Sequence, residues 1–484
     1  MADIHQSPYY LRLIYLIYHR NSALAHFLTH RVRPAGILLV LLIPSAWILM
    51  PTHALGPIFQ VRGLIFILLG VSLLWAFTRR ARVKATRELP RLATAGEPMH
   101  YRIKVRNTGR KTLSGSNLLD MPPDNRPSFQ LFSRSREPGE ETRNAFDRTF
   151  GYYRWEWLQK TLTLFTNKPS PPLPRLRTGE ETNLTLSLVP KKRGVIILKD
   201  LRLCLPDPFG IFQRCRIAES DRDKLIVLPH RYRLPLLDLP GSARFQLGGE
   251  AASSTIGQSG DFTSVREYRP GDPLRHIHWK SWARTGKPIV KEYEDVFFPR
   301  YGLVLDTFAP AEDANMFEEA VSVAASFAAS IDTRETLLDL MFIRDEAFVF
   351  SAGRGEERID KMLEILAGVN CEPTADFDAL QQLVLKYRDD LTACICIFTG
   401  WCEQRRDTIT RLQRAGMELK IISVCSNLDE AKKKPPALPV AYSCSLATRG
   451  SSTTGPYDPS VLTLLPFSEI SCPHPLHDYS PVPP

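Results

Sequence analysis

The chain has 484 residues, which is enough for two or three domains that each bury a core of their own. Apolar residues make up 44% and charged residues 24%, a globular composition that excludes a chain disordered throughout. The net charge of +10 points to nucleic acid or an anionic membrane as a partner, and the position of the basic residues decides between them.

Residues 1–33 form a basic and aromatic N-terminal segment. Within it, Tyr9–Tyr18 is apolar apart from Arg12, and His19 and Arg20 follow. This pattern predicts either an amphipathic helix that lies in a membrane interface or a helix that packs on the cytoplasmic end of the next segment. The sequence leaves both alternatives open.

Residues 34–80 contain two apolar runs. No Asp, Glu, Lys or Arg occurs from Pro34 to Val61, and Gly63–Thr78 is a second uncharged run. About 20 apolar residues are needed to span a bilayer. We therefore predict an N-terminal transmembrane helical hairpin over 34–80. The alternative is two buried helices of a soluble domain, which would leave the basic flanks without a role.

Basic residues flank the hairpin on both sides and fix its predicted orientation. Arg31 and Arg33 precede it, and only Arg62 lies in the connection. Six basic residues follow the second run: Arg79, Arg80, Arg82, Lys84, Arg87 and Arg91. By the positive-inside rule, both ends face the cytoplasm. The prediction is a multi-pass protein of the inner (cytoplasmic) membrane with its soluble domains in the cytoplasm.

Residues 93–230 show the alternation of half-buried strands. Apolar and polar residues alternate from Met99 to Arg106, and the same period recurs over 184–188 and 201–205. Short alternating strands separated by turns predict a β-rich, sandwich-like domain. An insertion at 133–178 interrupts this pattern. Aromatic residues at helical spacing predict a helix there, which packs on its own domain or on a partner: Phe146, Phe150, Tyr153 and Trp157.

A segment of paired charges and aromatic residues occupies 240–298. Between residues 260 and 294, basic and acidic side chains are interspersed, and Pro270-Gly271 suits a tight turn. Trp279 and Trp282 offer large apolar anchors on which arginine can stack. This mixture predicts an ordered ion-pair network or a recognition loop, and not a loose basic tail.

The same segment resembles the signature of domain-of-unknown-function family 58. The matching elements are Arg266-Glu267-Tyr268, Pro270-Gly271-Asp272, Arg275, Ile277, Trp279-Lys280, Ala283-Arg284 and Val290. The Asp207-Pro208-Phe209-Gly210 turn also resembles the family, so the resemblance covers roughly residues 35–445. His278 departs from it, because the family usually has an acid at that position.

The resemblance implies a von Willebrand factor A-like domain after the signature and a protein partner such as a MoxR-type AAA+ ATPase. It also implies a role in helping to assemble or activate other complexes, with no established enzymatic activity. On this basis we expect the binding residues of the signature segment to be Arg266, Glu267, Tyr268, Gly271, Asp272, Arg275, Trp279, Lys280 and Arg284.

Residues 299–445 alternate apolar strands with helices. A short strand at 301–305 ends at Asp306, and an amphipathic helix follows it. The alternation continues to residue 424 and predicts an α/β, Rossmann-like domain with a mostly parallel sheet. The tail, 451–484, is rich in Ser, Thr and Pro and is predicted to be disordered.

Asp306 stands where the metal site of von Willebrand factor A-like domains begins. The working motif is Asp-x-Ser-x-Ser, whose oxygens suit Mg²⁺. Here Phe308 and Pro310 replace both serines, and Phe398-Thr399-Gly400 supplies no carboxylate. We expect no cofactor, with Mg²⁺ on Asp306 as the less favoured alternative. Otherwise Asp306 caps the following helix or pairs with an arginine.

The nine cysteines are an odd number and none lies in a Cys-x-x-Cys pair, so the sequence supports neither a disulfide framework nor a zinc ribbon. This usage fits a reducing compartment. Cys394 and Cys396 lie in an apolar run, which indicates core cysteines. The chain also lacks His-Glu-x-x-His, the phosphate-binding loop motif and Gly-x-Ser-x-Gly, and we expect it not to be an enzyme.

Together these features predict a membrane-anchored, cytoplasmic-facing binding or assembly factor. Two alternatives stay open: a divalent-metal-dependent adhesion module, and a membrane-tethered nucleic-acid binder suggested by the basic balance. Residues 133–160 hold six basic and five acidic residues, and this near balance weakens the nucleic-acid hypothesis. The sequence does not indicate the oligomeric state.

Overall fold

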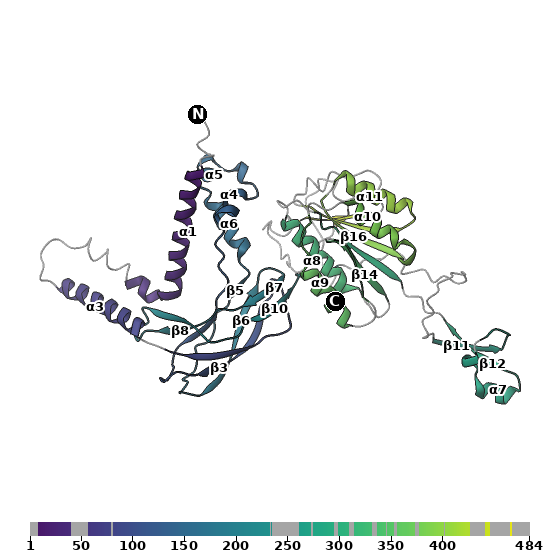
Figure 1. The fold of residues 1–484 in the computed structure, drawn as a ribbon, viewed down its shortest axis with the longest axis horizontal. Helices are drawn as coiled ribbons and strands as arrows, with labels where there is room; N and C mark the ends of the chain where they lie inside the picture. Colours follow the sequence, from purple (N-terminus) through teal and green to yellow (C-terminus); the bar gives the residue numbers. More distant parts are fainter. Residues whose placement is uncertain are drawn as a thin grey trace, which may run out of the picture. The chain divides into compact units, whose positions relative to one another are not determined.

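The structure is a computed structural model that describes residues 8–39, 57–78, 81–232, 234, 261–272, 274–294, 299–308, 314–331, 336–344, 346–352, 356–372, 377–400, 402–425, 441–445 and 465–466. Contacts divide the chain into two units, which are described separately: residues 1–230 with 363–369, and residues 231–362 with 370–484. Figure 1 follows the elements of both units along the sequence.

Two long helices precede the first strand: α1, Pro8–Arg31, and α3, Pro57–Thr78. Among the described residues, no helix has both the length and the apolar character that crossing a membrane requires. The second run of the predicted hairpin forms α3, whereas residues 40–56, which hold most of the first run, lie outside the described residues. The transmembrane hairpin predicted over 34–80 is thus not found in the described part of the chain.

One side of α3 makes polar contacts with the β-rich domain of the same unit. Ser72 is completely buried and donates a hydrogen bond to the carboxylate of Asp207. Near the end of the helix, Arg214 Nη1 donates to Ala76 O at 3.1 Å. The rest of the helix exposes large apolar side chains: Leu64, Phe66, Ile67, Val71, Leu73, Leu74 and Trp75. A helix that is apolar in sequence is therefore tied on one side to a polar surface.

The β-rich domain contains three sheets. The four-stranded sheet is antiparallel, in the order β1-β3-β6-β5, with β1 at Val83–Glu88, β3 at Met99–Asn107, β6 at Glu181–Pro190 and β5 at Phe165–Asn167. Buried and exposed residues alternate along all of β3, which confirms the predicted strand. The first strand, β1, lies before residue 93, where the domain was predicted to begin.

Two three-stranded sheets complete the domain. One has the order β2-β10-β7, with β2 at Leu92–Thr94, β10 at Asp223–Leu228 and β7 at Gly194–Leu198. The other has the order β4-β8-β9, with β4 at Asn117–Asp120, β8 at Leu201–Pro206 and β9 at Gln213–Ile217. Side chains from all three sheets share one hydrophobic cluster, to which Ile103, Leu203 and Val227 contribute. This layered core agrees with a sandwich-like domain.

Strands β8 and β9 are joined by a disulfide between Cys204 and Cys215, which are direct partners in the antiparallel register. The sequence supported no disulfide framework and did not indicate this single pair. The two residues are 11 apart in sequence and carry no local motif, and they meet only because the hairpin pairs them.

A buried ion pair crosses the same domain. Arg87 on β1 donates from Nη2 to Asp120 Oδ1 at 2.6 Å, and Tyr101 on β3 donates from its hydroxyl to Asp120 Oδ2 at 2.7 Å. Arg87 Nη1 also contacts Asp223 Oδ2 at 3.0 Å. The sequence placed Arg87 among the basic residues that follow the hairpin. Its side chain is buried among carboxylates, so its charge is compensated within the domain.

The insertion at 133–178 is largely helical, beginning slightly earlier: α4, Phe129–Arg134; η2, Glu140–Thr142; α5, Ala145–Phe150; and α6, Tyr152–Leu162. Asn144 Oδ1 caps α5 by accepting from Asp147 N at 2.7 Å. Gly151 then takes a left-handed conformation, with φ of 60°, which ends α5 and begins α6.

That break alters the predicted aromatic stripe. Helical periodicity does not continue through Gly151, and Phe146 is left 68% exposed. The buried face is instead made by Phe132 of α4 and Trp155 of α6, which pack against Tyr15 of α1. The insertion therefore packs on α1 of its own unit through Phe132 and Trp155, whereas Phe146, Phe150 and Tyr153 of the predicted stripe are exposed.

The signature segment forms a separate antiparallel hairpin. Strands β11, Asp261–Glu267, and β12, Ile289–Glu294, are its two arms. The connection contains a short 3₁₀ turn, η3, Leu274–His276, and helix α7, Trp279–Thr285. Ile277 is buried and bridges Val290, so the connection folds back onto β12.

The C-terminal part forms a seven-stranded mixed sheet in the order β15-β14-β13-β16-β17-β18-β19. The neighbouring pairs from β14 through β18 are parallel, and β15 and β19 are antiparallel edges. The strands are β13, Arg300–Leu305; β14, Leu337–Ile343; β15, Ala347–Ala352; β16, Ala393–Thr399; β17, Glu418–Cys425; β18, Ala441–Ser445; and β19, Leu465–Pro466.

Helices alternate with these strands, as the sequence predicted. They are α8, Ala314–Ser330; α9, Glu356–Ala367; α10, Phe377–Lys386; and α11, Glu403–Arg414. Helices α10 and α11 pack on one face of the sheet in a cluster that includes Cys394 and Cys396. Burial raises the pKa of the Cys394 thiol to about 12, as expected for a core cysteine. Strand β19 comes from the tail predicted to be disordered, and most of that tail lies outside the described residues.

Candidate functional site

The turn of the signature hairpin is held by Asp272. Arg266 donates from Nη1 to Asp272 Oδ2 at 2.7 Å and from Nη2 to Oδ1 at 2.8 Å, and the backbone N–H of Arg269 donates to Oδ2 at 2.8 Å. The Arg266 hydrogen bonds, followed by the Arg269 backbone bond, lower the pKa of Asp272 to about 2. Asp272 is therefore an ionised structural anchor.

Pro270 and Gly271 give this turn its shape. Asp272 N donates to Arg269 O at 3.0 Å, which closes a four-residue turn. Gly271 has φ of +110°, a conformation that other residues rarely adopt. Proline followed by a residue with positive φ is the sequence pattern of a type II turn, so the predicted tight turn is confirmed.

Helix α7 presents two stacked tryptophans. The rings of Trp279 and Trp282 lie 5.3 Å apart with an interplanar angle of 18°, and Trp279 is 65% exposed. The helix is held on β12 by His278, whose backbone N–H donates to Ile289 O at 2.8 Å. The ring Nδ1 of His278 lies 2.6 Å from Ser281 Oγ. A large exposed aromatic surface is thus fixed on a short, well-anchored helix.

The structure divides the predicted binding residues into two groups. Arg266, Gly271 and Asp272 build the turn. Glu267 pairs with Lys287 at 3.1 Å on the surface, and Tyr268 joins the two strands through its backbone N–H, which donates to Pro288 O at 2.9 Å. These residues give the hairpin its shape, and the remaining predicted binding residues are the ones available for contact with a partner.

The second group is exposed: Arg275, Trp279, Lys280 and Arg284. Within the described part of the hairpin, no carboxylate pairs with Arg275, Lys280 or Arg284. Leu274 is 68% exposed and adds an apolar side chain that no sequence pattern had marked. The hairpin therefore offers apolar and positively charged groups for contact with a partner.

Asp306 lies at the end of β13 and is completely buried. Its Oδ2 accepts from Arg405 Nε at 2.8 Å, Thr399 Oγ1 at 3.0 Å and Thr399 N at 3.1 Å, and its Oδ1 accepts from Phe308 N at 2.9 Å. The guanidinium of Arg405 also donates to Phe308 O at 2.8 Å. The predicted alternative, in which Asp306 pairs with an arginine, matches this arrangement.

These residues do not fit a Mg²⁺ cage. A magnesium ion takes near-octahedral oxygen ligands, and here a single carboxylate already neutralises an internal guanidinium. Nowhere among the described residues do three or more His, Cys, Asp or Glu side chains gather as a metal site would need. Arg405 supplies the positive charge that a metal ion would otherwise provide.

Comparisons with known proteins agree with the signature segment. Residues 264–437 match the model of the family described as "Protein of unknown function DUF58", a shorter region than the expected 35–445. "Uncharacterized protein YeaD" of Bacillus subtilis (strain 168) is 31% identical over 182 residues, which are 37% of this chain and 44% of that protein. The match therefore spans less than half the length of this curated relative.

Two solved structures show weak likenesses to this chain. A Salmonella alpha-2-macroglobulin mutant has 13% identity and a TM-score of 0.17 over 32% of this chain and 7% of that chain. Vibrio cholerae VesB protease has 9% identity and a TM-score of 0.15 over 32% of this chain and 34% of that chain. Scores this low carry no argument about fold or function. Residues 264–437 thus match the DUF58 family of proteins of unknown function, and 182 residues of the chain are distantly similar to YeaD.

Proposed function

We propose that this chain is a membrane-anchored binding or assembly factor whose hairpin, residues 261–294, docks an acidic surface of a protein partner. The observation that carries the proposal is the exposed positive charge of Arg275, Lys280 and Arg284 beside the exposed Trp279, with no carboxylate of the described hairpin paired to it. Tryptophan and arginine are the side chains that most often dominate binding energy at protein interfaces. A MoxR-type AAA+ ATPase is the candidate partner, since the family resemblance implies one.

The rigidity of the hairpin supports this role. Asp272 receives hydrogen bonds from Arg266 and Arg269, and Gly271 fixes the turn. A surface that is ordered before binding loses less conformational entropy when the partner arrives. The exposed side chains therefore contribute more of their contact energy to affinity. Binding without catalysis is the role that these groups support.

Membrane attachment is the second part of the proposal. Helix α3 exposes seven large apolar side chains in one helix, which is unusual for a surface that faces only water. Basic residues flank the segment, and by the positive-inside rule they favour a cytoplasmic orientation of the soluble units. We propose that the segment around α3 anchors the chain to the inner membrane.

A pull-down with the full chain, solubilised from membranes, tests partner binding. We expect a reproducible protein partner that is lost from the Trp279→Ala and Lys280→Glu variants. A matched control is Lys192→Glu, which reverses an exposed charge in the β-rich domain. Recovery of the same partner by all variants, or of no partner by the unaltered chain, contradicts the proposal.

Cysteine labelling in cells tests the orientation. A reducing cytoplasm keeps most thiols reduced. If the β-rich domain is cytoplasmic, Cys204 and Cys215 should react with a membrane-permeant thiol reagent in intact cells, although they form a disulfide in the structure. Resistance of this pair to alkylation until a reductant is added would contradict the cytoplasmic orientation.

Nucleic acid is the second candidate partner. Stacked tryptophans beside exposed arginines also resemble the platforms on which unpaired bases stack. A fluorescence titration with single-stranded DNA at low salt separates the two candidates. Affinity that falls steeply with salt and requires Trp279 favours the nucleic-acid binder, and its absence leaves the protein partner.

A further inference from the structure

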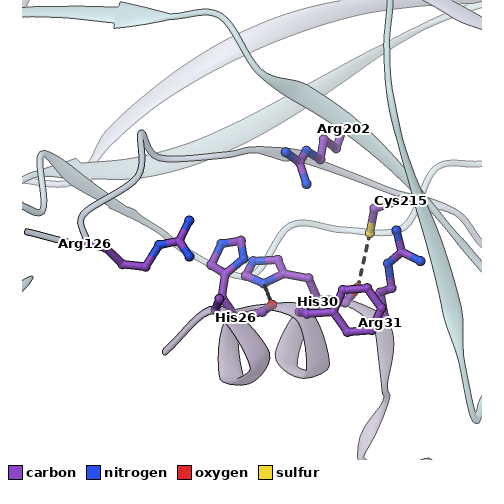
Figure 2. Close-up of a pocket in the computed structure, with 8 residues that line it drawn as sticks. His26, His30, Arg31, Arg126, Arg202 and Cys215 are labelled. Carbon is purple, nitrogen blue, oxygen red and sulfur yellow. Dashed lines mark hydrogen bonds between the residues drawn. The ribbon is translucent and has the colours of Figure 1, made fainter. Parts of the chain in front are cut away.

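A small pocket lies between α1 and the β-rich domain, far along the chain from the signature hairpin. It has a volume of about 220 Å³. Its polar lining consists of three arginines and two histidines: Arg31, Arg126, Arg202, His26 and His30. Figure 2 shows the side chains of Arg126 and Arg202 pointing toward the two histidines. Elements from three places in the sequence thus bring cationic groups to one cavity.

Carboxylates hold two of these arginines in place. Arg126 contacts Asp124 through Nε at 2.7 Å and through Nη2, and Arg202 contacts Asp200 through Nε at 3.1 Å and Nη2 at 2.7 Å. In both arginines, Nη1 takes no part in the contact with the carboxylate. Since the guanidinium orientation is already fixed, a ligand that accepts hydrogen bonds from the remaining edge loses little side-chain entropy.

The histidines have a defined arrangement. His30 Nδ1 lies 2.8 Å from His26 O, a carbonyl that can only accept, so this nitrogen carries a proton. The remaining nitrogen, Nε2, becomes a second donor when the ring is protonated. The two rings stack with centroids 4.3 Å apart. A protonated pair in this position would donate to an anion that lies between it and the arginines.

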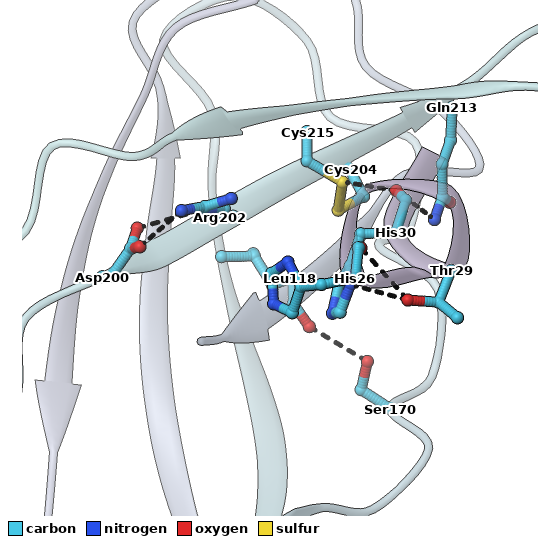
Figure 3. Close-up of a disulfide and its surroundings, with 10 residues drawn as sticks. All are labelled: His26, Thr29, His30, Leu118, Ser170, Asp200, Arg202, Cys204, Gln213 and Cys215. Atoms are coloured by element: carbon cyan, nitrogen blue, oxygen red, sulfur yellow. Dashed lines mark hydrogen bonds and ion pairs between the residues drawn. A yellow bond between two sulfur atoms is a disulfide. The ribbon is translucent and has the colours of Figure 1, made fainter. Parts of the chain in front are cut away.

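The strand side of the pocket is firmly attached to the last turn of α1. Gln213 Nε2 donates to His30 O at 3.0 Å, and Cys215 Sγ lies 3.3 Å from the same oxygen. Figure 3 shows these contacts beside the Cys204–Cys215 disulfide. Because β9, which carries Cys215, pairs in antiparallel register with β8, which carries Arg202, the two sides of the pocket keep their spacing.

The charges around the pocket favour an anion. Three arginines and two carboxylates leave one net positive charge, and protonation of both histidines would raise this to three. The C-terminal end of α1 carries partial negative charge and opposes an anion, so the arginines have to outweigh it. Burial, followed by His30, Arg202 and Arg126, lowers the pKa of His26, while Asp124 opposes that shift. A bound anion would relieve the repulsion among these cations.

We propose that this pocket binds a phosphate-type oxyanion, supplied either as free phosphate or as the headgroup of an anionic lipid. Its volume is several times the roughly 30 Å³ that one water molecule occupies in the liquid, which is enough for a tetrahedral oxyanion. Arginine is the side chain best suited to bind such an anion through two N–H groups.

Calorimetric titration of the full chain with inorganic phosphate tests the site. At pH 6 we expect a clear heat of phosphate binding to the full chain. Arg126→Gln, Arg202→Gln and His26→Gln should each weaken it at least tenfold. His26 is an exposed residue, so its variant keeps the test valid if an arginine variant fails to fold. Arg102→Gln, at an exposed position on β3, is the matched control.

Vesicles distinguish the two sources of phosphate. The full chain is mixed with vesicles of phosphatidylcholine alone or with added phosphatidylglycerol, and the His26→Gln variant is compared with Arg102→Gln. Extra binding to the anionic vesicles that depends on His26 and is competed by phosphate identifies the lipid headgroup. Phosphate binding without this difference identifies a soluble phosphate.

Absence of phosphate binding at pH 6 together with equal vesicle binding by all variants overturns the proposal. So does phosphate binding that none of the pocket variants weakens. The Trp279→Ala variant should bind phosphate normally, so failure of the partner proposal and failure of this one give different results.

Discussion

Arg405 reaches Asp306 across the end of the central sheet, with 2.8 Å between its Nε and the carboxylate Oδ2, although the two residues are 99 positions apart. Both side chains are buried, and Thr399 and the Phe308 backbone complete their hydrogen bonds. An internal guanidinium thus supplies the counter-charge of this buried carboxylate. The carboxylate depends on that guanidinium for charge compensation.

Removal of this guanidinium should destabilise the C-terminal domain. We expect Arg405→Ala to lower the free energy of unfolding by about 3 kcal/mol or more, because it leaves a buried carboxylate without its counter-charge. Urea denaturation of the full chain, followed by tryptophan fluorescence and circular dichroism, measures the change. Arg406→Ala is the control, since Arg406 is half exposed and pairs with exposed Glu403, a contact worth at most about 1 kcal/mol. Equal effects of the two variants would contradict the assigned role.

The signature turn should respond to strong acid. The pKa of Asp272 is about 2 in the folded chain, against 3.8 for the unperturbed group. A lowered pKa means that the ionised form stabilises the turn fully above about pH 3.8 and that this contribution is lost as the pH falls toward 2. Carbon NMR of selectively labelled aspartate should show this carboxyl titrating near pH 2. In Arg266→Gln its pKa should rise toward 3.8, and an unchanged value would refute the assignment to Arg266.

Local patterns predicted much of the fold. Period-two alternation predicted β3, because one face of that strand is buried and the other is exposed to solvent. The Pro270-Gly271 pair predicted the turn, since its conformation depends on neighbouring residues alone. Alternating apolar strands and amphipathic helices predicted the α/β domain. Each of these features depends on residues that lie close together in the chain, and for that reason a single sequence was sufficient to predict them.

Long-range pairing could not be predicted in the same way. The contacts of Arg405 with Asp306 and of Cys204 with Cys215 arise from tertiary and hairpin geometry, and no motif marks them. Arg87 has the sequence context of a membrane-flanking residue, yet it is buried beside Asp120. The pocket that contains His26 combines a helix, a loop and two strands, so no single segment signals it.

The buried contact between Tyr101 and Asp120 gives a third prediction. Burial, followed by the nearby carboxylate, raises the pKa of Tyr101, so its hydroxyl stays protonated and donates at 2.7 Å. We expect Tyr101→Phe to lower the free energy of unfolding by about 1.5–3 kcal/mol, the range for a hydrogen bond to a charged group. Asp120→Ala should cost more, about 3–5 kcal/mol, because Arg87 then remains buried without its main partner.

Urea denaturation of Tyr101→Phe, of Asp120→Ala and of the variant that carries both changes measures these losses in the free energy of unfolding. The double variant should be less destabilised than the sum of the single variants, because Tyr101 and Asp120 share one contact. Strict additivity would mean that the two side chains do not interact in solution.

The cross-strand disulfide gives a fourth prediction, about the stability of the β-rich domain. It closes a loop across 11 positions, and the chain-entropy model assigns a loop of this size about 3 kcal/mol. We therefore expect the double variant Cys204→Ala with Cys215→Ala to unfold at a lower urea concentration than the oxidised chain. Reductant should lower the midpoint of the unaltered chain by a similar amount and leave the variant unchanged. Cys402→Ser, which removes an exposed free thiol, is the control and should still respond to reductant. If reductant has no effect on the unaltered chain, the pairing does not stabilise the hairpin that supports one wall of the cationic pocket.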